Sequence, residues 1–268
     1  MASSDSANTA TPLGSLSIII PVLNNAQGFA NAIGSILHQL TETDEIIVID
    51  GGSTDGTLEQ IQRFSHYIAY WESGFDSGIA DAFNRGINAS SNDIVAILNS
   101  DDRWMPTTAD TVKRAFQRRN DADLVCGAIR YVSDTKQHTY LRYPNLKKMK
   151  FKMHLFHPST FIRRRAYENL GGYNDDFHFA MDSEWIHRAI CHNRTFYLLD
   201  DVLAEMALGG VSDIYFNKSL EEYRQSLIDH HLCSRLESYI YLKTQIMKKR
   251  IAQYPGMYAI KKLVDGLA

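Results

Sequence analysis

Apolar residues in the first hundred positions form short uninterrupted runs, separated by segments in which they recur every three or four positions. The first run, LSIIIPV, covers residues 16–22, and similar runs follow at 44–50, 67–73 and 93–99. Short runs rich in β-branched residues are typical of strands that are buried on both faces. The pattern therefore predicts four strands in this part of the chain.

The segments between these runs have the periodicity of amphipathic helices. Within residues 24–40, Phe29, Ile33 and Ile36 recur at spacings of three and four, which places them on one helix face. Further helices are expected from about Leu58 and over residues 76–90. Strands that alternate with helices predict an α/β fold around a mostly parallel sheet.

Polar residues gather where each predicted strand ends. They are Asn24 and Asn25 after the first strand, residues 50–55 after the second, 72–76 after the third and 99–102 after the fourth. Open parallel sheets bind their ligands at the carboxyl ends of the strands. The sequence therefore predicts a ligand site at this edge of the sheet.

Two adjacent carboxylates, Asp101 and Asp102, follow the fourth run. A helix cap would use one of them and leave the second repelled by the first. A divalent cation removes that repulsion, and Mg²⁺ or Mn²⁺ needs only one or two carboxylates when phosphate oxygens and waters complete its shell. The pair therefore favours a metal-diphosphate site.

Composition narrows the class of protein. The chain has 268 residues, of which 44% are hydrophobic and 22% charged, so it can bury a large core. A net charge of -3 does not favour nucleic acid as a partner. The three cysteines have no CxxC spacing, which argues against a disulfide framework or a zinc site and favours a reducing cytoplasm.

The chain divides into three predicted regions. Residues 1–15 are small and polar, without the features of a signal peptide, and are expected to form a disordered leader. A large α/β domain is expected over residues 16–210, with halves at 16–105 and 106–210, and a helical region over 211–268. No run approaches the roughly 18 apolar residues of a membrane span, so a soluble or peripheral protein is expected.

Six ordered segments resemble one known family. LSIIIPVLNN, EIIVIDGGSTDGT, GIADAFNRGI and ILNSDD, within residues 16–105, resemble the family 2 glycosyltransferases of the GT-A fold. HPSTFIRRRAYENLGGYNDDF and AMDSEWIHRA resemble the acceptor-side half of the same family. The resemblance implies a GT-A (Rossmann-like), mostly parallel sheet flanked by helices, with a C-terminal helical extension.

The resemblance also implies an activity. Family members transfer a sugar with inversion from a nucleoside diphosphate donor, with Mn²⁺ or Mg²⁺ as cofactor, and a UDP-hexose is the expected donor here. The expected acceptor is a hydroxyl of a glycan or of a polyprenyl-diphosphate-linked sugar, in the synthesis of a bacterial surface polysaccharide such as lipopolysaccharide or capsule. Such an enzyme would lie in the cytoplasm or at the inner face of the cell membrane.

Roles for individual residues follow from the same resemblance. Asp182 falls at the position of the catalytic base, and Asp101, Asp102 and His157 at the metal site. The residues expected at the nucleotide sugar are Pro21, Asn24, Asp50, Gly51, Asp76, Arg85, Asn99, Ser100 and Asp101.

Some positions depart from the family or allow a second interpretation. Many relatives have a second acidic residue where this chain has Gly51, so recognition of the base or ribose would depend on Asp50. Many also have Asp in place of Asn99, whose neutral side chain lowers the expected metal affinity. An exposed Asp81–Arg85 pair is an equal alternative to a diphosphate contact for Arg85. An ordinary core residue is the alternative for His157.

The end of the chain is aromatic and basic. Residues 213–250 are expected to form one long helix in which Tyr239 and Met247 accompany Lys243 and the run 248–250. That pattern suits the surface of an anionic membrane, but a dimer helix or an ordinary packed helix fits equally well. The GGVS segment at 209–212 resembles a loop that closes over the donor in relatives.

Three other functions are alternatives to glycosyl transfer. A nucleotidyltransferase usually has a glycine-rich basic loop after its first strand, which PVLNNAQGF is not, and has no use for an acceptor base at Asp182. A dehydrogenase would require a GxGxxG motif there, and none is present. A non-catalytic sugar-nucleotide-binding subunit would bind the donor but release no nucleoside diphosphate.

Overall fold

The computed structural model describes residues 14–132, 139–149, 152–207 and 214–252. The strands are β1 (Leu16–Val22), β2 (Glu45–Asp50), β3 (Tyr70–Ser73), β4 (Ile94–Ile97), β5 (Arg103–Trp104), β6 (Leu124–Val132), β7 (Thr139–Arg142), β8 (Thr160–Arg163) and β9 (Phe196–Ala207). The α-helices are α1 (Ala26–Ile36), α2 (Thr57–Arg63), α3 (Ile79–Ala89), α4 (Thr108–Arg118), α5 (Arg164–Leu170), α6 (Met181–Cys191), α8 (Phe216–Asp229) and α9 (Arg235–Ala252). Short 3₁₀ turns include η1 (Leu37–Gln39), η2 (Ser65–Tyr67) and η4 (His157–Ser159).

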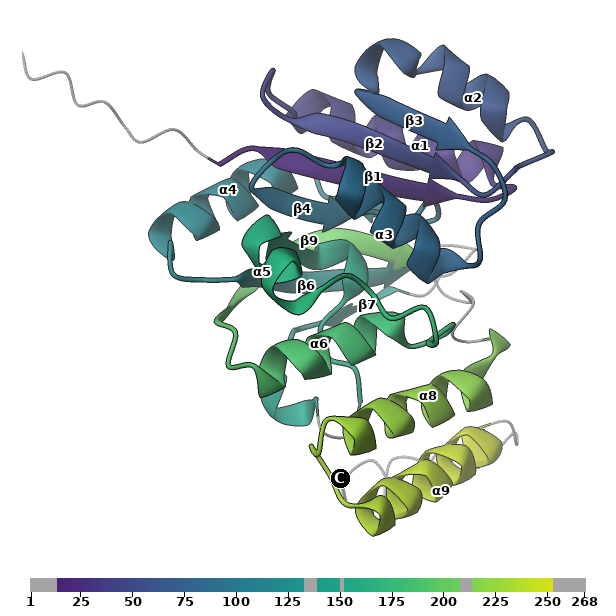
Figure 1. Ribbon diagram of the computed structural model, residues 1–268, viewed down its shortest axis with the longest axis vertical. Helices are drawn as coiled ribbons and strands as arrows, with labels where there is room; N and C mark the ends of the chain where they lie inside the picture. The colour runs from purple at the N-terminus through teal and green to yellow at the C-terminus, as the bar shows by residue number, and fades with distance from the viewer. Residues whose placement is uncertain (1–13, 133–138, 150–151, 208–213, 253–268) are drawn as a thin grey trace, which may run out of the picture.

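All of these strands join one sheet, in the order β3-β2-β1-β4-β8-β6-β9-β5, with β7 beside β6 (Figure 1). Strands β1 to β4 are parallel to one another, as the alternation of strands and helices predicts. The second half is mixed, because β8 runs antiparallel to both β4 and β6, whereas β9 runs parallel to β6. The carboxyl ends of β1 to β4 therefore share one edge of the sheet.

Both faces of the first strands are buried, which explains their uninterrupted apolar runs. Ile18 and Ile20 of β1 pack with Phe29 of α1, whereas Ile19 between them packs on the other face with Phe83 of α3. Side chains of a strand alternate between faces, so a strand covered by helices on both sides has no position for a polar residue.

Helix α3 lies unusually close to the sheet. An added Cβ at Gly86 would be 2.3 Å from Cγ2 of Ile19, so only glycine permits this approach. The helix begins beside the carboxyl ends of β2 and β3. Its close packing thus fixes residues 76–85 relative to the predicted ligand site.

The C-terminal region differs from the prediction of one helix over residues 213–250. Two helices, α8 and α9, are separated by a turn in which His231 has a left-handed φ of 55°. Ser234 starts the second helix: its Oγ accepts from the N–H of Glu237, and the Glu237 carboxylate accepts from the N–H of Ser234. This reciprocal capping box marks the start of α9.

Smaller differences concern where elements begin and end. The predicted helix over 24–40 ends at Ile36 and continues only as η1, and the predicted strand over 67–73 begins at Tyr70 after η2. The predicted leader up to residue 13, the loop at 209–212 and residues 253–268 lie outside the described residues. Among the described helices, none has the length and apolarity needed to cross a membrane.

Candidate active site

Asp50 ends β2 and is fully buried. Its Oδ2 accepts hydrogen bonds from the backbone N–H groups of Gly52 at 3.1 Å and Ser53 at 3.0 Å, and from the Ser73 hydroxyl at 2.5 Å. Its Oδ1 is buried and has no partner among the described residues. Buried carboxylate oxygens are normally paired, so Oδ1 is available to a donor group on a ligand.

The loop after β1 is tied to the loop after β2. The N–H of Asn24 donates to the Ser53 hydroxyl at 2.7 Å, and Oδ1 of Asn24 accepts from the N–H of Thr54 at 2.8 Å. Asn24 adopts a left-handed φ of 49°, a conformation that Asn tolerates better than most residues. Pro21 pairs with Ile49 in the sheet, so Pro21 and Asn24 lie beside Asp50 as predicted by their positions at strand ends.

Asp76 lies against Gly51. A Cβ on Gly51 would be 2.8 Å from Oδ2 of Asp76, whose Oδ1 accepts from the N–H of Gly78. Burial raises the pKa of Asp76, and the nearby charges of Asp81 and Asp50 add smaller increases. The Asp76 carboxylate therefore occupies space that a side chain at position 51 would enter.

Arg85 projects from α3 toward β3. Its Nε donates to Oε1 of Glu72 at 2.7 Å, and both side chains are partly buried. The hydrogen bond to Glu72 raises the pKa of Arg85, and the charges of Asp81 and Asp76 act in the same direction. The partner of Arg85 is thus Glu72, and the alternative of an exposed ion pair with Asp81 is not what the structure shows.

The end of β4 presents four consecutive polar residues. Ser100 accepts a hydrogen bond from the side-chain amide of Asn25, at 3.1 Å, which joins this loop to the one after β1. Asp102 is only 2% exposed, and its Oδ1 accepts from the N–H of Ala207 at 3.3 Å. Oδ2 of Asp102 and Oδ1 of Asn99 are buried without a partner among the described residues.

Asp101 and Asp102 differ in exposure, although they are neighbours. Asp101 faces solvent, whereas burial and the charge of Asp101 raise the pKa of Asp102 well above its usual range. Partial burial also raises the pKa of Asp101. Both shifts indicate unfavourable negative charge, which a bound cation would relieve.

This arrangement fits a metal that is shared with a ligand. Asp101 and Oδ2 of Asp102 offer two carboxylates, and among the described residues no group of three or more His, Cys, Asp or Glu side chains could hold an ion. Mg²⁺ and Mn²⁺ are commonly held by one or two carboxylates with phosphate oxygens. The residues present therefore fit a divalent cation that a diphosphate helps to bind.

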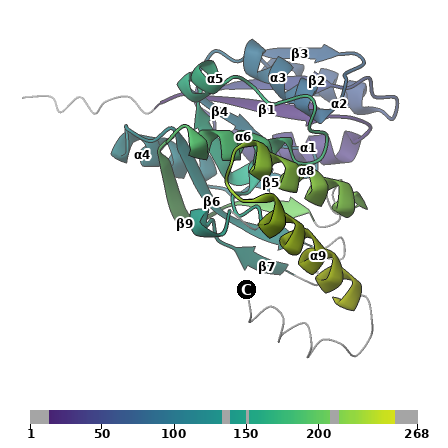
Figure 2. The same cartoon turned by 60° about the horizontal axis from the view of Figure 1, so that its bottom comes forward.

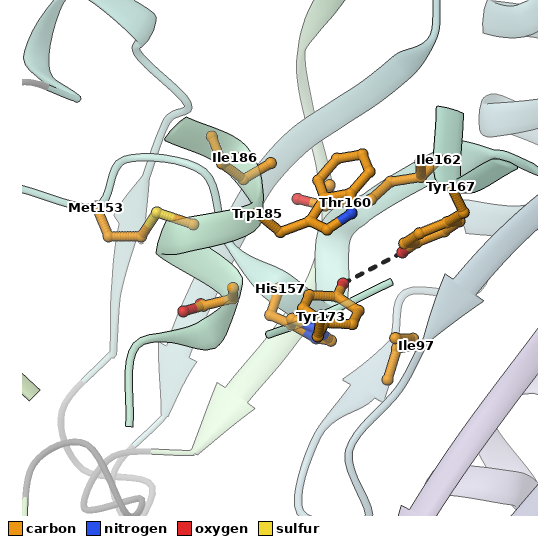
Figure 3. A pocket seen from close by; sticks show the side chains of 10 residues that line it. Ile97, Met153, His157, Thr160, Ile162, Tyr167, Tyr173, Trp185 and Ile186 are labelled. Atoms are coloured by element: carbon orange, nitrogen blue, oxygen red, sulfur yellow. Dashed lines mark hydrogen bonds between the residues drawn. The ribbon is translucent and has the colours of Figure 1, made fainter. Parts of the chain in front are cut away.

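A second part of the candidate site is a small cavity of about 20 Å³, which has room for a water molecule. It lies between β4, β8, η4 and α6 (Figure 3). The lining residues are Ile97, Met153, His157, Thr160, Ile162, Tyr167, Tyr173, Asp182, Trp185 and Ile186. Ile97 lies two residues before Asn99, so this cavity adjoins the polar edge of the sheet.

Asp182 stands in the first turn of α6 and is half-buried. Its Oδ1 accepts from the N–H of Ser183 at 2.7 Å and from the Ser183 hydroxyl at 3.2 Å. Burial raises the pKa of Asp182, and the charge of Glu222 adds a smaller increase. A carboxylate with a raised pKa is a stronger base than an ordinary one.

His157 lies in the same cavity as Asp182. Its ring stacks on Phe83, with centroids 4.8 Å apart, and its Nδ1 is buried with no partner among the described residues. Burial lowers the pKa of His157 to about 4, so the ring is neutral at neutral pH. Its predicted role as a metal ligand stays a prediction.

Sequence reasoning did not identify the aromatic wall of this cavity. The hydroxyl groups of Tyr167 and Tyr173 lie 3.2 Å apart (Figure 3), and the Trp185 indole packs 4.9 Å from the Tyr167 ring. Of these three residues, only Trp185 could have been placed beside Asp182 from the sequence, because it follows Asp182 by three positions and so lies on the same side of a helix. The tyrosines depend on how α5 and the following loop fold back onto α6.

Comparisons with known proteins agree with this geometry. Residues 17–188 match the model of glycosyl transferase family 2. A PGL/p-HBAD biosynthesis glycosyltransferase of Mycobacterium bovis is 29% identical over 215 residues, which cover 75% of this chain and 80% of the relative. An uncharacterised glycosyltransferase of Mycobacterium tuberculosis is 30% identical over 185 residues, 67% of this chain and 70% of the relative.

Solved structures share the fold at low sequence identity. The mannosyltransferase PcManGT of Pyrobaculum calidifontis, in complex with GDP-Man and Mn²⁺, has a TM-score of 0.65 and 17% identity, covering 95% of this chain and 85% of its own. TarS of S. aureus in complex with UDP-GlcNAc has a TM-score of 0.60 and 14% identity, and the match covers 89% of this chain and 73% of the TarS chain.

The chain therefore belongs to glycosyltransferase family 2 and has the GT-A fold. The family and the fold expected from the sequence are both confirmed, and with them an activity of glycosyl transfer.

Proposed function

We propose that this protein is a metal-dependent, inverting glycosyltransferase that moves a hexose from a UDP-hexose to a hydroxyl of a glycan or lipid-linked acceptor. The observation that carries the proposal is the set of buried oxygens of Asp50, Asn99 and Asp102 along one edge of the sheet, which have no hydrogen-bond partner among the described residues. Oxygens of this kind are costly unless a ligand or ion pairs with them.

The donor would bind across the ends of β1 to β4. Pro21 and Asn24 would line the nucleoside pocket, and Oδ1 of Asp50 would accept a hydrogen bond from the base or ribose. Asp76, close against Gly51, would add a second acceptor there. Asp101 and Asp102 would hold Mn²⁺ or Mg²⁺, which as a Lewis acid supplies charge stabilisation to the departing diphosphate.

Asp182 would act as the base. Its carboxylate would take the proton of the acceptor hydroxyl while the acceptor oxygen forms a bond to the anomeric carbon and the bond to the diphosphate oxygen breaks. Attack from the face opposite the leaving group inverts the anomeric centre. The Ser183 N–H and hydroxyl hold one oxygen of Asp182 in place, which leaves the other to receive the proton.

The names of relatives support the choice of substrates without fixing them. One mycobacterial relative is a PGL/p-HBAD biosynthesis glycosyltransferase, and structural neighbours were solved with UDP-GlcNAc and with GDP-Man. We propose a uridine donor and a bacterial surface glycan or glycolipid as acceptor.

The test is a two-stage assay on the full chain. A panel of UDP- and GDP-sugars is first screened by thermal shift with Mn²⁺, because a ligand that binds only the folded state raises its melting temperature. Release of the nucleoside diphosphate is then measured with Mn²⁺ and with EDTA. Stabilisation by a UDP-sugar and chelator-sensitive release support the proposal. Binding without release in any metal would instead indicate a non-catalytic subunit.

A further inference from the structure

Helix α9 forms an outer layer of the molecule. It packs on α8, which in turn packs on α6 (Figure 2). The side of α9 that faces inward carries Ser238 and Leu242, which are 2% and 8% exposed. The opposite side of the helix is exposed.

That outward side is apolar, against the usual pattern of a surface helix. Leu236, Tyr239, Ile240 and Met247 are between 49% and 68% exposed, and their spacing places them on one face. Lys243 lies among them, with Nζ 5.2 Å from the Tyr239 ring centroid. We call these five residues the outer stripe. A surface of this kind marks an interaction site more often than chance exposure.

Charge is also concentrated on this helix. Its sequence, RLESYIYLKTQIMKKRIA, contains five basic residues, three of them consecutive at 248–250. The one acidic residue, Glu237, is engaged in the capping box with Ser234. The whole chain has a net charge of -3, so the positive charge of α9 is local, and exposed Lys243 carries part of it within the outer stripe.

We propose that the outer stripe of α9 docks on the surface of an anionic lipid membrane. The apolar side chains would enter the interface between headgroups and acyl chains, while Lys243 would contact lipid phosphates. A second copy of the chain fits less well, because it would bring two equally basic helices together.

The position of α9 connects this surface to the cavity of Asp182. The Glu222 carboxylate on α8 accepts from the N–H groups of Phe179 at 2.7 Å and Ala180 at 2.9 Å, immediately before α6. A docked α9 would thus hold the cavity at a fixed distance from the membrane, which suits a lipid-linked acceptor. That last consequence rests on the proposed function, whereas the docking itself does not.

The experiment measures binding of the full-length protein to phosphatidylcholine vesicles with and without phosphatidylglycerol, by flotation at low and high salt. We expect binding only to the anionic vesicles, weakened by salt. Lys243→Gln should weaken it about fivefold, the usual effect of one cation at such a surface. Tyr239→Glu should weaken it about tenfold or more, because it places a carboxylate in the stripe.

Tyr67→Glu is the matched control. Tyr67, in η2, is 51% exposed, against 49% for Tyr239. Its segment connects α2 to β3, which lie at the opposite end of the molecule from α9 (Figure 1). The substitution should leave vesicle binding unchanged. Equal binding to neutral vesicles, equal loss in Tyr67→Glu, or no binding to either vesicle would each overturn the proposal. So would a dimer, seen by sedimentation, that Tyr239→Glu disrupts while vesicle binding stays unchanged. None of these readouts depends on glycosyl transfer.

Discussion

Asp102 accepts a hydrogen bond from the backbone N–H of Ala207, which is 105 positions away and is the last residue of β9. One carboxylate oxygen is thereby held by the main chain, and the other remains buried without a partner among the described residues. Asp101, in contrast, is exposed. The two neighbouring acids therefore have different environments in the same loop. Asp102 connects the loop after β4 to the end of β9, whereas Asp101 faces solvent.

Substituting each acid in turn should distinguish the roles of Asp101 and Asp102. We expect Asp101→Asn and Asp102→Asn each to lower metal-dependent turnover by about a hundredfold or more, or ~3 kcal/mol, because each removes a charge that attracts the cation. Asp102→Asn should also keep or raise the melting temperature of the metal-free protein, since it removes a buried charge whose pKa is raised. Full Mn²⁺-stimulated turnover in both variants would show that the cation binds elsewhere.

Asp182→Asn should fold and bind donor normally while losing transfer by roughly 10²- to 10⁴-fold, the usual contribution of a positioned base. Activity of the unmodified enzyme should fall on acidification at a higher pH than an ordinary carboxyl group would dictate, because the pKa of Asp182 is raised and the protonated form cannot accept the hydroxyl proton.

Glu222→Gln provides the control for this pH dependence. The variant removes a negative charge that raises the pKa of Asp182 but keeps an oxygen that can accept from Phe179 and Ala180. The acid limb of the rate profile should move to lower pH. A limb that stays in place, or a loss below about tenfold in Asp182→Asn, would assign the base to another residue.

Two glycines on helices should respond oppositely to the same substitution. Gly86→Ala forces a methyl group against Ile19 and should lower the free energy of unfolding by about 1–3 kcal/mol. Gly34→Ala, at an exposed position of α1, meets nothing within 4 Å and should raise it by about 0.5–1 kcal/mol. Urea denaturation measures both. Equal effects would contradict the close contact between α3 and β1.

Stability should fall at acidic pH through His187. Its ring is fully buried in α6, with Nδ1 2.8 Å from the Ser226 hydroxyl, and burial lowers its pKa to about 4. The unfolded chain takes up this proton at a higher pH than the folded chain, so stability is complete above about pH 6.5 and declines toward pH 4. One such group contributes up to about 3 kcal/mol over that interval.

His187→Gln should reduce the acid-dependent loss in unfolding free energy, measured in urea between pH 7 and pH 4. His192→Gln, on an exposed residue just after the same helix, should leave that loss unchanged. If both variants follow the pH dependence of the unmodified protein, His187 does not cause the decline.

The parallel half of the fold was predictable because its information is local. The apolar runs of β1 and β2 and the periodicity of Phe29 and Ile33 each lie within a few residues. The break between α8 and α9 was also encoded locally, as the capping box of Ser234 and Glu237, but the regular spacing of apolar residues across it favoured one helix.

Most of the candidate site depends on contacts that no local pattern records. The bond between Asp102 and Ala207 joins residues from two halves of the chain, and Tyr173 reaches the Asp182 cavity through a loop without regular structure. Strand ends can be located from sequence, and with them Asp50 and Asp101. The partners of each side chain follow from the mixed second half of the sheet, whose order the sequence does not reveal.

The contact between Gly51 and Asp76 has a consequence for the engineering of donor preference. Any side chain at position 51 would place its Cβ 2.8 Å from Oδ2 of Asp76, so the Asp76 carboxylate would have to move. A substitution at position 51 therefore also displaces Asp76, and its effect on donor preference reports on the two residues together.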